Sequence, residues 1–224
     1  MIKILYNKNM RKCFLFDFDG TIVDSIPTYT KAVTSILDSE SITYGNDLIK
    51  TVTPPGYKGT AEYYKDNFPI SLTVDEMIEQ MRDKMYHAYA NEIKAKDTVI
   101  DTMHTLKSRG HSLNVLTASP HIVLDACLKR LGIYDLFDNV WSCEDFSTTK
   151  SDPDIYLKCA EKLGVEVGEV IFLDDNYDAD KTAKTAGAKV IGVYDSFSDE
   201  YVEQMKKICD GYIYKFKELL DYDL

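Results

Sequence analysis

One short segment near the start of the chain restricts the fold more than any other. Residues 13–16 are Cys-Phe-Leu-Phe, an apolar run typical of a buried strand, and Asp17, Phe18, Asp19 and Gly20 follow directly. A buried strand gains nothing from ending in two carboxylates, whereas ligands bind at the carboxyl ends of strands in α/β proteins. The segment therefore predicts an α/β fold. The two carboxylates at the edge of its sheet are suited to bind Mg²⁺, to act as a nucleophile or to serve in acid–base chemistry.

Helical and strand patterns alternate from about residue 96 onward. Strands are predicted at 112–117, near 140–141, and at 170–173, 189–193 and 212–214, with helices at 98–109, up to 131, 153–163 and 179–186. This alternation with short connections is typical of a parallel, doubly wound sheet. Thr117 ends one predicted strand, and Asp174 and Asp175 follow another, so polar residues of three strands are expected at one edge.

The segment between the first strand and residue 96 has a different character. Apolar residues recur at helical spacing in 26–95, and residues 73–76 (Thr-Val-Asp-Glu) have the pattern of a capping box. We therefore expect a helical cap at 26–95 inserted into a core formed by 10–25 and 96–224. Residues 1–9 are expected to be an N-terminal extension, either an extra strand or a mis-assigned start.

The composition excludes some classes of binding partner. The chain has 26 Lys and Arg against 37 Asp and Glu, a net charge of −11, so it lacks the electrostatic footprint of a nucleic-acid or membrane-surface protein. No stretch approaches the roughly 18 apolar residues of a membrane helix. Five widely spaced cysteines without a CxxC pair indicate free thiols in a reducing cytoplasm. We expect a monomer or weak homodimer.

The polar residues occur in an ordered set. The segment 17–25 (DFDGTIVDS) is followed by Thr117, then by Lys150, then by the pair Asp174 and Asp175. This order resembles the four motifs of the haloacid dehalogenase-like phosphohydrolases, and the resemblance covers the chain from about residue 11. It implies a Rossmann-like doubly wound parallel sheet as the core, with an inserted all-α cap.

The resemblance implies a role for each motif residue. Asp17 would be the nucleophile that forms an aspartyl-phosphate, and Asp19 the general acid that later acts as base on water. The Thr117 hydroxyl and the Ala118 backbone N–H would bind the phosphoryl oxygens. Lys150 would hold Asp17 ionised beside the phosphate.

The same resemblance implies a magnesium site. Its ligands would be the Asp17 carboxylate, the Asp19 main-chain carbonyl and the Asp175 carboxylate, because Mg²⁺ prefers oxygen ligands in octahedral geometry. Substrate phosphate and water would complete the coordination.

Three further side chains are assigned around these motifs. Asp174 and Asp178 are expected close to the metal ligands, with Asp180 as the alternative to Asp178. Lys58, in the Pro/Gly-containing loop of the expected cap, is a candidate substrate-binding residue.

The predicted function is Mg²⁺-dependent hydrolysis of a small, soluble phosphorylated metabolite. A sugar phosphomutase similar to β-phosphoglucomutase is the alternative, and it would form glucose 6-phosphate from β-glucose 1-phosphate without net phosphate release. A non-catalytic phosphoaspartate or ligand-binding module is a remote second alternative.

Overall fold

The computed structural model describes residues 11–45, 47–52 and 56–222, and the predicted extension 1–9 lies outside them. Its centre is a six-stranded, wholly parallel sheet with strand order β3-β2-β1-β4-β5-β6. The strands are β1 Cys13–Phe16, β2 Ser112–Thr117, β3 Asn139–Ser142, β4 Val170–Asp174, β5 Lys189–Val193 and β6 Gly211–Ile213. The predicted parallel, doubly wound α/β fold is confirmed.

Side chains of the central strands alternate between two hydrophobic layers. Phe14 and Phe16 of β1 pack into one buried cluster, while Leu15 between them packs into the other. Both faces of a parallel sheet are covered in this way because the crossover helices lie on both sides. Helices α5 (Val99–Ser108) and α6 (His121–Arg130) cover the first face, and α7 (Asp154–Leu163) and α8 (Tyr177–Ala186) cover the second.

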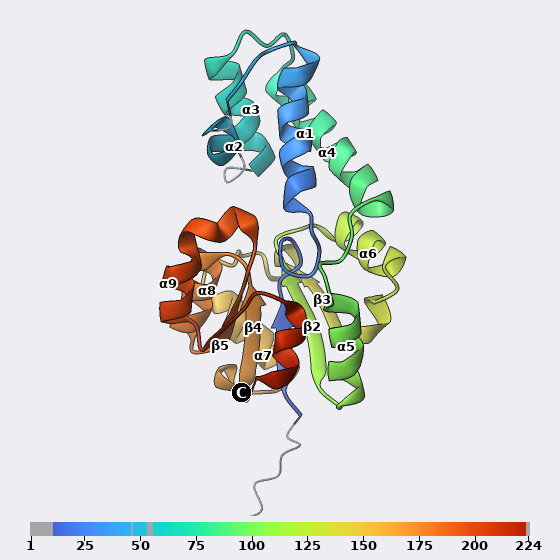
Figure 1. Ribbon diagram of the computed structural model, residues 1–224, viewed down its shortest axis with the longest axis vertical. Coiled ribbons are helices and arrows are strands. Elements are labelled where there is room, and N and C mark those ends of the chain that lie inside the picture. The colour runs from blue at the N-terminus through green and yellow to red at the C-terminus, as the bar shows by residue number, and fades with distance from the viewer. Residues whose placement is uncertain (1–10, 46, 53–55, 223–224) are drawn as a thin grey trace, which may run out of the picture.

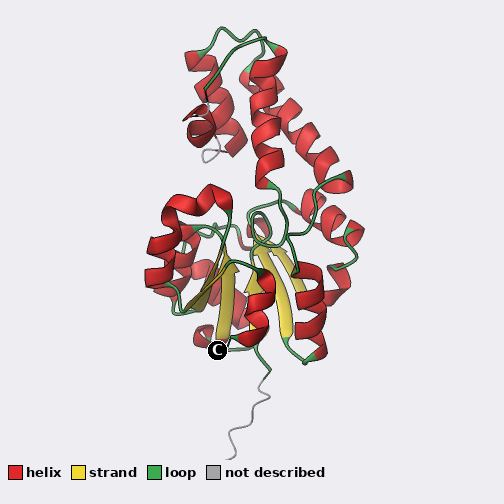
Figure 2. Cartoon of the chain, viewed as in Figure 1, coloured by secondary structure: helices red, strands yellow, loops and turns green. Residues whose placement is uncertain are grey.

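Four helices stand beyond the sheet, above the edge where the strands end (Figures 1 and 2). They are α1 Ile26–Ser39, α2 Asp47–Val52, α3 Gly56–Asn67 and α4 Val74–Asn91, and they enclose a hydrophobic cluster of their own. The predicted capping box is confirmed, because Thr73 and Glu76 bond each other's backbone N–H at the start of α4. The assignment of 26–95 to a separate cap stays a prediction.

The chain enters and leaves this helical segment side by side. Val23 pairs with Ala95 in an antiparallel bridge, and the Asp24 N–H donates to the Lys94 carbonyl at 2.9 Å. The end of α4 is also fixed to the sheet layer, because the Arg130 guanidinium donates to the carbonyls of Tyr89 and Ile93. Both ends of the segment are therefore held against the core.

One predicted helix begins earlier than expected, and two helical elements near the chain end were not predicted. Helix α8 begins at Tyr177 rather than 179, because the Asn176 side chain accepts the N–H groups of the first turn and caps the helix there. Near the chain end, α9 (Val202–Ile208) precedes β6, and the 3₁₀ helix Phe216–Asp221 follows β6. None of the described helices has the length and apolar character needed to cross a membrane.

Candidate active site

The ends of β1 and β4 bring three carboxylates together. Pairing of Phe16 with Leu173 continues into a 2.8 Å bond from the Asp17 N–H to the Leu173 carbonyl, so Asp17 lies beside the end of β4. Asp17, Asp174 and Asp175 are all buried and each offers an oxygen within 4.8 Å of the others. The adjacent parallel strands thus bring together acidic residues that are far apart in the sequence.

Lys150 is the cation of this cluster. Its ammonium donates to Asp17 Oδ1 at 2.5 Å and to Asp174 Oδ2 at 2.6 Å, and its side chain is 15% exposed. The Tyr156 hydroxyl donates to the Lys150 carbonyl at 3.1 Å, which ties the loop before α7 to the helix. Burial acts to lower the pKa of Lys150, but the two carboxylates outweigh it and the pKa is raised, so the ammonium stays charged.

The cluster contains more acidic groups than basic ones. Burial raises the pKa of Asp17 well above its usual range although Lys150 opposes this, and burial together with Asp174 raises that of Asp175 to about 8. Three acids share one ammonium, so a further cation would relieve the repulsion. Clustered carboxylate oxygens are the donor set that Mg²⁺ prefers, and these residues fit that ion.

The loop after β1 supports the Asp175 carboxylate. Thr21 Oγ1 donates to Asp175 Oδ1 at 3.0 Å, and Gly20 adopts a left-handed φ of +79° directly against the same carboxylate. A Cβ on Gly20 would lie 2.5 Å from Asp175 Oδ2, so only glycine lets the backbone approach this closely.

Gly20→Ala is expected to weaken Mg²⁺ binding. The new methyl group must displace a buried carboxylate of the cluster, and the left-handed backbone adds about 1–2 kcal/mol of strain. Thermal unfolding measured over a Mg²⁺ titration would show a smaller metal-dependent rise in the variant. Gly110→Ala is the matched control, because Gly110 has a φ of +84° but open space around it. Equal metal responses in the two variants would contradict the role of Gly20.

Asp19 projects toward the helical segment and accepts three hydroxyl hydrogen bonds. Ser25 and Tyr89 donate to Oδ1 at 2.7 and 2.5 Å, and Ser119 donates to Oδ2 at 2.5 Å. The Tyr89 ring also stacks on Phe18 with centroids 5.9 Å apart. The carboxylate is thus oriented by residues of the β1 loop, α4 and the β2 loop.

Tyr89→Phe is expected to lower kcat about tenfold, because Asp19 loses one of its three donors while the ring packing on Phe18 is kept. Steady-state kinetics of phosphate release, with thermal unfolding of the same preparation, measure the effect. Tyr201→Phe, at an exposed tyrosine away from Asp19, is the control. An unchanged kcat with lower thermal stability would reduce Tyr89 to a packing role.

The predicted phosphate-binding residues lie at the end of the neighbouring strand β2. Thr117 is buried, and its Oγ1 accepts the Ser119 N–H at 3.0 Å, which shapes the turn after the strand. Ala118 is exposed and lines a cavity together with Asp19. The structure therefore brings Thr117, Ala118 and Asp19 to one edge, while their roles stay predictions.

Two predicted site residues do not reach this edge. Asp178 is exposed in the first turn of α8, whereas Asp180 is fully buried, because two residues along a helix the side chain points to nearly the opposite face. Burial and the charge of Asp174 raise the pKa of Asp180, so Asp180 replaces Asp178 as the acid near the cluster. Lys58 is also displaced: its side chain is 79% exposed and lies 3.8 Å from Glu62, outside the cavity lining.

Lys96 also stabilises the loops of the candidate site, although the sequence did not identify it. Its ammonium donates to the carbonyls of Gly20 and Tyr194 at 2.6 and 2.7 Å and to Asp195 Oδ2 at 3.0 Å. It joins the loops after β1 and β5 behind the cluster. No motif marks a lysine that binds mainly backbone carbonyls, so the sequence offered no signal for it.

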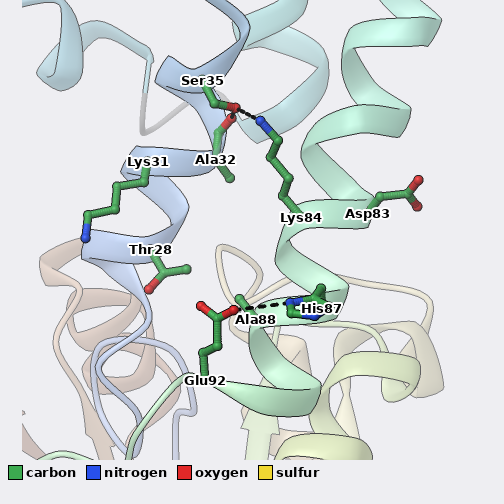
Figure 3. A pocket seen from close by; sticks show the side chains of 9 residues that line it. All are labelled: Thr28, Lys31, Ala32, Ser35, Asp83, Lys84, His87, Ala88 and Glu92. Carbon is green, nitrogen blue, oxygen red and sulfur yellow. Dashed lines mark hydrogen bonds and ion pairs between the residues drawn. The ribbon is translucent and has the colours of Figure 1, made fainter. Parts of the chain in front are cut away.

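A cavity of about 740 Å³ opens next to Asp19, between α1, α3 and α4 on one side and α6 on the other. A second hollow of about 530 Å³ lies between α1 and α4 and does not contain the motif residues. Figure 3 shows that polar side chains there bond one another, Lys84 to Ser35 and His87 to Glu92. The first cavity is therefore the one that connects with the candidate catalytic groups.

Comparison with known proteins assigns the chain to a family. The family model described as haloacid dehalogenase-like hydrolase matches residues 14–193, which is most of the chain. The chain is a haloacid dehalogenase-like hydrolase. The matched range includes the carboxylate cluster, Lys150 and the helices above the sheet, so the family assignment covers the whole candidate site of this hydrolase.

Named relatives of this hydrolase cover most of its length. It is similar to the pyrophosphatase PpaX of Bacillus velezensis (28% identity; 80% of this chain, 81% of the relative). It is also similar to a phosphoglycolate phosphatase of Psychrobacter arcticus (23% identity; 95% of each chain). The crystal structure of a predicted phosphoglycolate phosphatase from Haemophilus somnus has a TM-score of 0.81 at 22% identity, over 94% of this chain and 97% of that one. That structural likeness shows the shared fold.

Proposed function

We propose that this hydrolase releases inorganic phosphate from small, soluble phosphorylated metabolites with the help of Mg²⁺. The observation that carries the proposal is the joint placement of Asp17, Asp19 and Lys150 beside the acid pair of β4, next to a cavity. Several relatives, including those from Psychrobacter arcticus and Escherichia coli, bear the name phosphoglycolate phosphatase. Both the residues and the relatives favour phosphoryl transfer.

In the proposed reaction Asp17 attacks phosphorus and forms an aspartyl-phosphate. Lys150 holds Oδ1, and among the described residues no hydrogen bond engages Oδ2, so this oxygen is available for attack. As the bond from phosphorus to the alcohol oxygen breaks, protonated Asp19 gives its proton to that oxygen. In the second half-reaction the Asp19 carboxylate takes a proton from the attacking water, and Asp17 and phosphate are released.

The acidic cluster would hold the metal in this proposal. Asp17 and Asp175 offer carboxylate oxygens, and Asp174 lies beside them on Lys150. The bound ion would supply positive charge that offsets the repulsion between Asp17 and the phosphate dianion. Thr117 and the Ala118 N–H lie at the neighbouring strand end, where they would bind phosphoryl oxygens.

Phosphate release from a panel of phosphomonoesters tests the proposal. We expect release with Mg²⁺ and a loss of at least about a thousandfold after EDTA treatment, with recovery on adding the metal back. Folded protein that binds Mg²⁺ but releases no phosphate from any ester would contradict it. In that case, conversion of β-glucose 1-phosphate to glucose 6-phosphate would establish the mutase alternative.

A further inference from the structure

The lining of the cavity next to Asp19 is dominated by aromatic and aliphatic side chains. Four tyrosines belong to it, and they come from α1, α3 and α4: Tyr29, Tyr57, Tyr86 and Tyr89. Aliphatic side chains complete the wall: Ile26, Met85, Ala118, Pro120, Ile122 and Val123. We refer to these ten residues as the aromatic wall. A cavity of about 740 Å³ lies within the roughly 300–1,000 Å³ typical of sites for sizeable organic ligands.

Part of this wall is exposed to solvent. Tyr86 is 47% exposed on α4, and Ile122 is 67% exposed on α6, yet both line the same cavity. A cluster of large apolar side chains exposed to solvent is typical of a surface that binds a ligand or a partner. Here the cavity also contains Asp19, so the ligand that covers them is the substrate.

The hydroxyl groups nearest the chemistry are already engaged. Ser25, Ser119 and Tyr89 all donate to Asp19, so they are not free to donate to a leaving group. A small polyhydroxylated group placed against Tyr86 and Ile122 would lose its water hydrogen bonds without replacement. This outer part of the wall therefore favours a flat apolar group, while the hydrogen-bonding side chains of the cavity include Arg82, Asp83 and Glu144.

Arg82 adds a cation at the rim of this wall. It carries the only positive charge among the described lining residues, and no ion pair or hydrogen bond of the described residues holds it. Arg82 and Tyr57 line the same cavity, and the charge of Arg82 opposes the rise in the pKa of Tyr57 that burial causes. A guanidinium beside aromatic rings stacks well on a further ring.

We propose that the substrate's leaving group carries an aromatic ring, which binds between the aromatic wall and Arg82. This inference rests on the hydrolase function proposed above and names the substrate class of the same site. The Tyr29 and Tyr57 rings, 5.4 Å apart and tilted by 38°, form the inner part of the binding surface, and Tyr86 and Ile122 form the outer part. The phosphate end then points to Asp19 and the carboxylate cluster.

Matched esters test the aromatic preference without changing the chemistry of the leaving oxygen. Phenethyl, cyclohexylethyl and ethyl phosphate are all esters of primary alcohols. The first carries a flat aromatic ring, the second a saturated ring and the third no ring. We expect kcat/KM for phenethyl phosphate to exceed that for ethyl phosphate about tenfold or more. It should exceed that for cyclohexylethyl phosphate about threefold or more, because aromatic pairs gain beyond their buried area.

Variants locate the preference in the cavity. Tyr86→Ala is expected to reduce the ratio of kcat/KM for phenethyl over ethyl phosphate about fivefold or more. Tyr214→Ala is the matched control, since Tyr214 is 52% exposed and lies outside the cavity lining. Equal ratios for the two variants, or a wild-type ratio near one, would overturn the aromatic assignment while leaving phosphate release intact.

Binding separates the two proposals. Calorimetric titration of the Asp17→Asn protein with the same three esters measures recognition without turnover. Tighter binding of phenethyl phosphate than of its cyclohexyl analogue supports the ring site even if the wild-type protein releases no phosphate. Equal affinities overturn it even if wild-type phosphate release is fast.

Discussion

Asp17→Asn is expected to abolish phosphate release, with kcat lower by at least about a thousandfold, because the amide oxygen cannot form the aspartyl-phosphate. The fold should be retained. Lys150 keeps its 2.6 Å hydrogen bond to Asp174 in the variant, and the amide preserves the size and shape of the Asp17 side chain. Phosphate release and thermal unfolding, measured on the same preparation, check both halves of the expectation.

Asp154→Asn is the matched control for that experiment. Asp154 is an exposed acid in the first turn of α7, and among the described residues its one ion pair is with Lys158, at 3.3 Å. It should keep full activity. Residual activity of Asp17→Asn within about tenfold of wild type would contradict a nucleophilic role for Asp17.

Lys150→Met is expected to impair both activity and stability. The substitution leaves Asp17 and Asp174 buried without their shared cation, and loss of one partner of a buried ion pair costs about 3–5 kcal/mol. Activity should fall about a thousandfold or more, since one of the positive charges that offset the repulsion between Asp17 and the phosphate is lost. Urea unfolding and phosphate release measure the two effects.

The stability loss should grow with pH. Without Lys150 the pKa of Asp17 rises further, so the folded variant holds protons that the unfolded chain releases. Stability falls with rising pH wherever the folded state binds more protons, so the deficit should be larger at about pH 8 than at about pH 5. Lys158→Met, at an exposed lysine of α7, should show no such trend. A pH-independent deficit would contradict this origin of the instability.

A double variant distinguishes the stabilising role of Lys150 from its role in catalysis. Lys150→Met combined with Asp174→Asn removes the cation and one of its two carboxylates, so it should recover part of the lost stability. Activity should not recover, because Asp17 still lacks its ammonium. Recovery of both would show that Lys150 serves only the fold.

The motif residues of the candidate site were predictable because they coincide with strand ends. Asp17, Thr117 and the acid pair of β4 each follow a run of apolar residues, and parallel strands end at one edge. Lys150 follows from family resemblance rather than from any strand. The capping box at Thr73 was also visible, since its hydrogen bonds link residues three apart in the sequence.

Other features depended on contacts that no local pattern records. Tyr89 and Ser119 bond Asp19 from 70 and 100 residues away, and Lys96 binds carbonyls rather than a motif. The choice between Asp178 and Asp180 depended on the start of α8. Once Asn176 caps that helix, its periodicity directs Asp180 inward and leaves Asp178 in solvent.

The sequence by itself determined the α/β class, the order of the motifs and the identity of the clustered acids, because apolar periodicity and strand-end polarity are local properties of the chain. Only the tertiary structure decided which hydroxyls orient Asp19, which acid of the first turn of α8 is buried and which side chains line the cavity. These features depend on how α1, α3 and α4 pack above α6, and packing between distant elements is set by their shapes in three dimensions rather than by spacing along the chain.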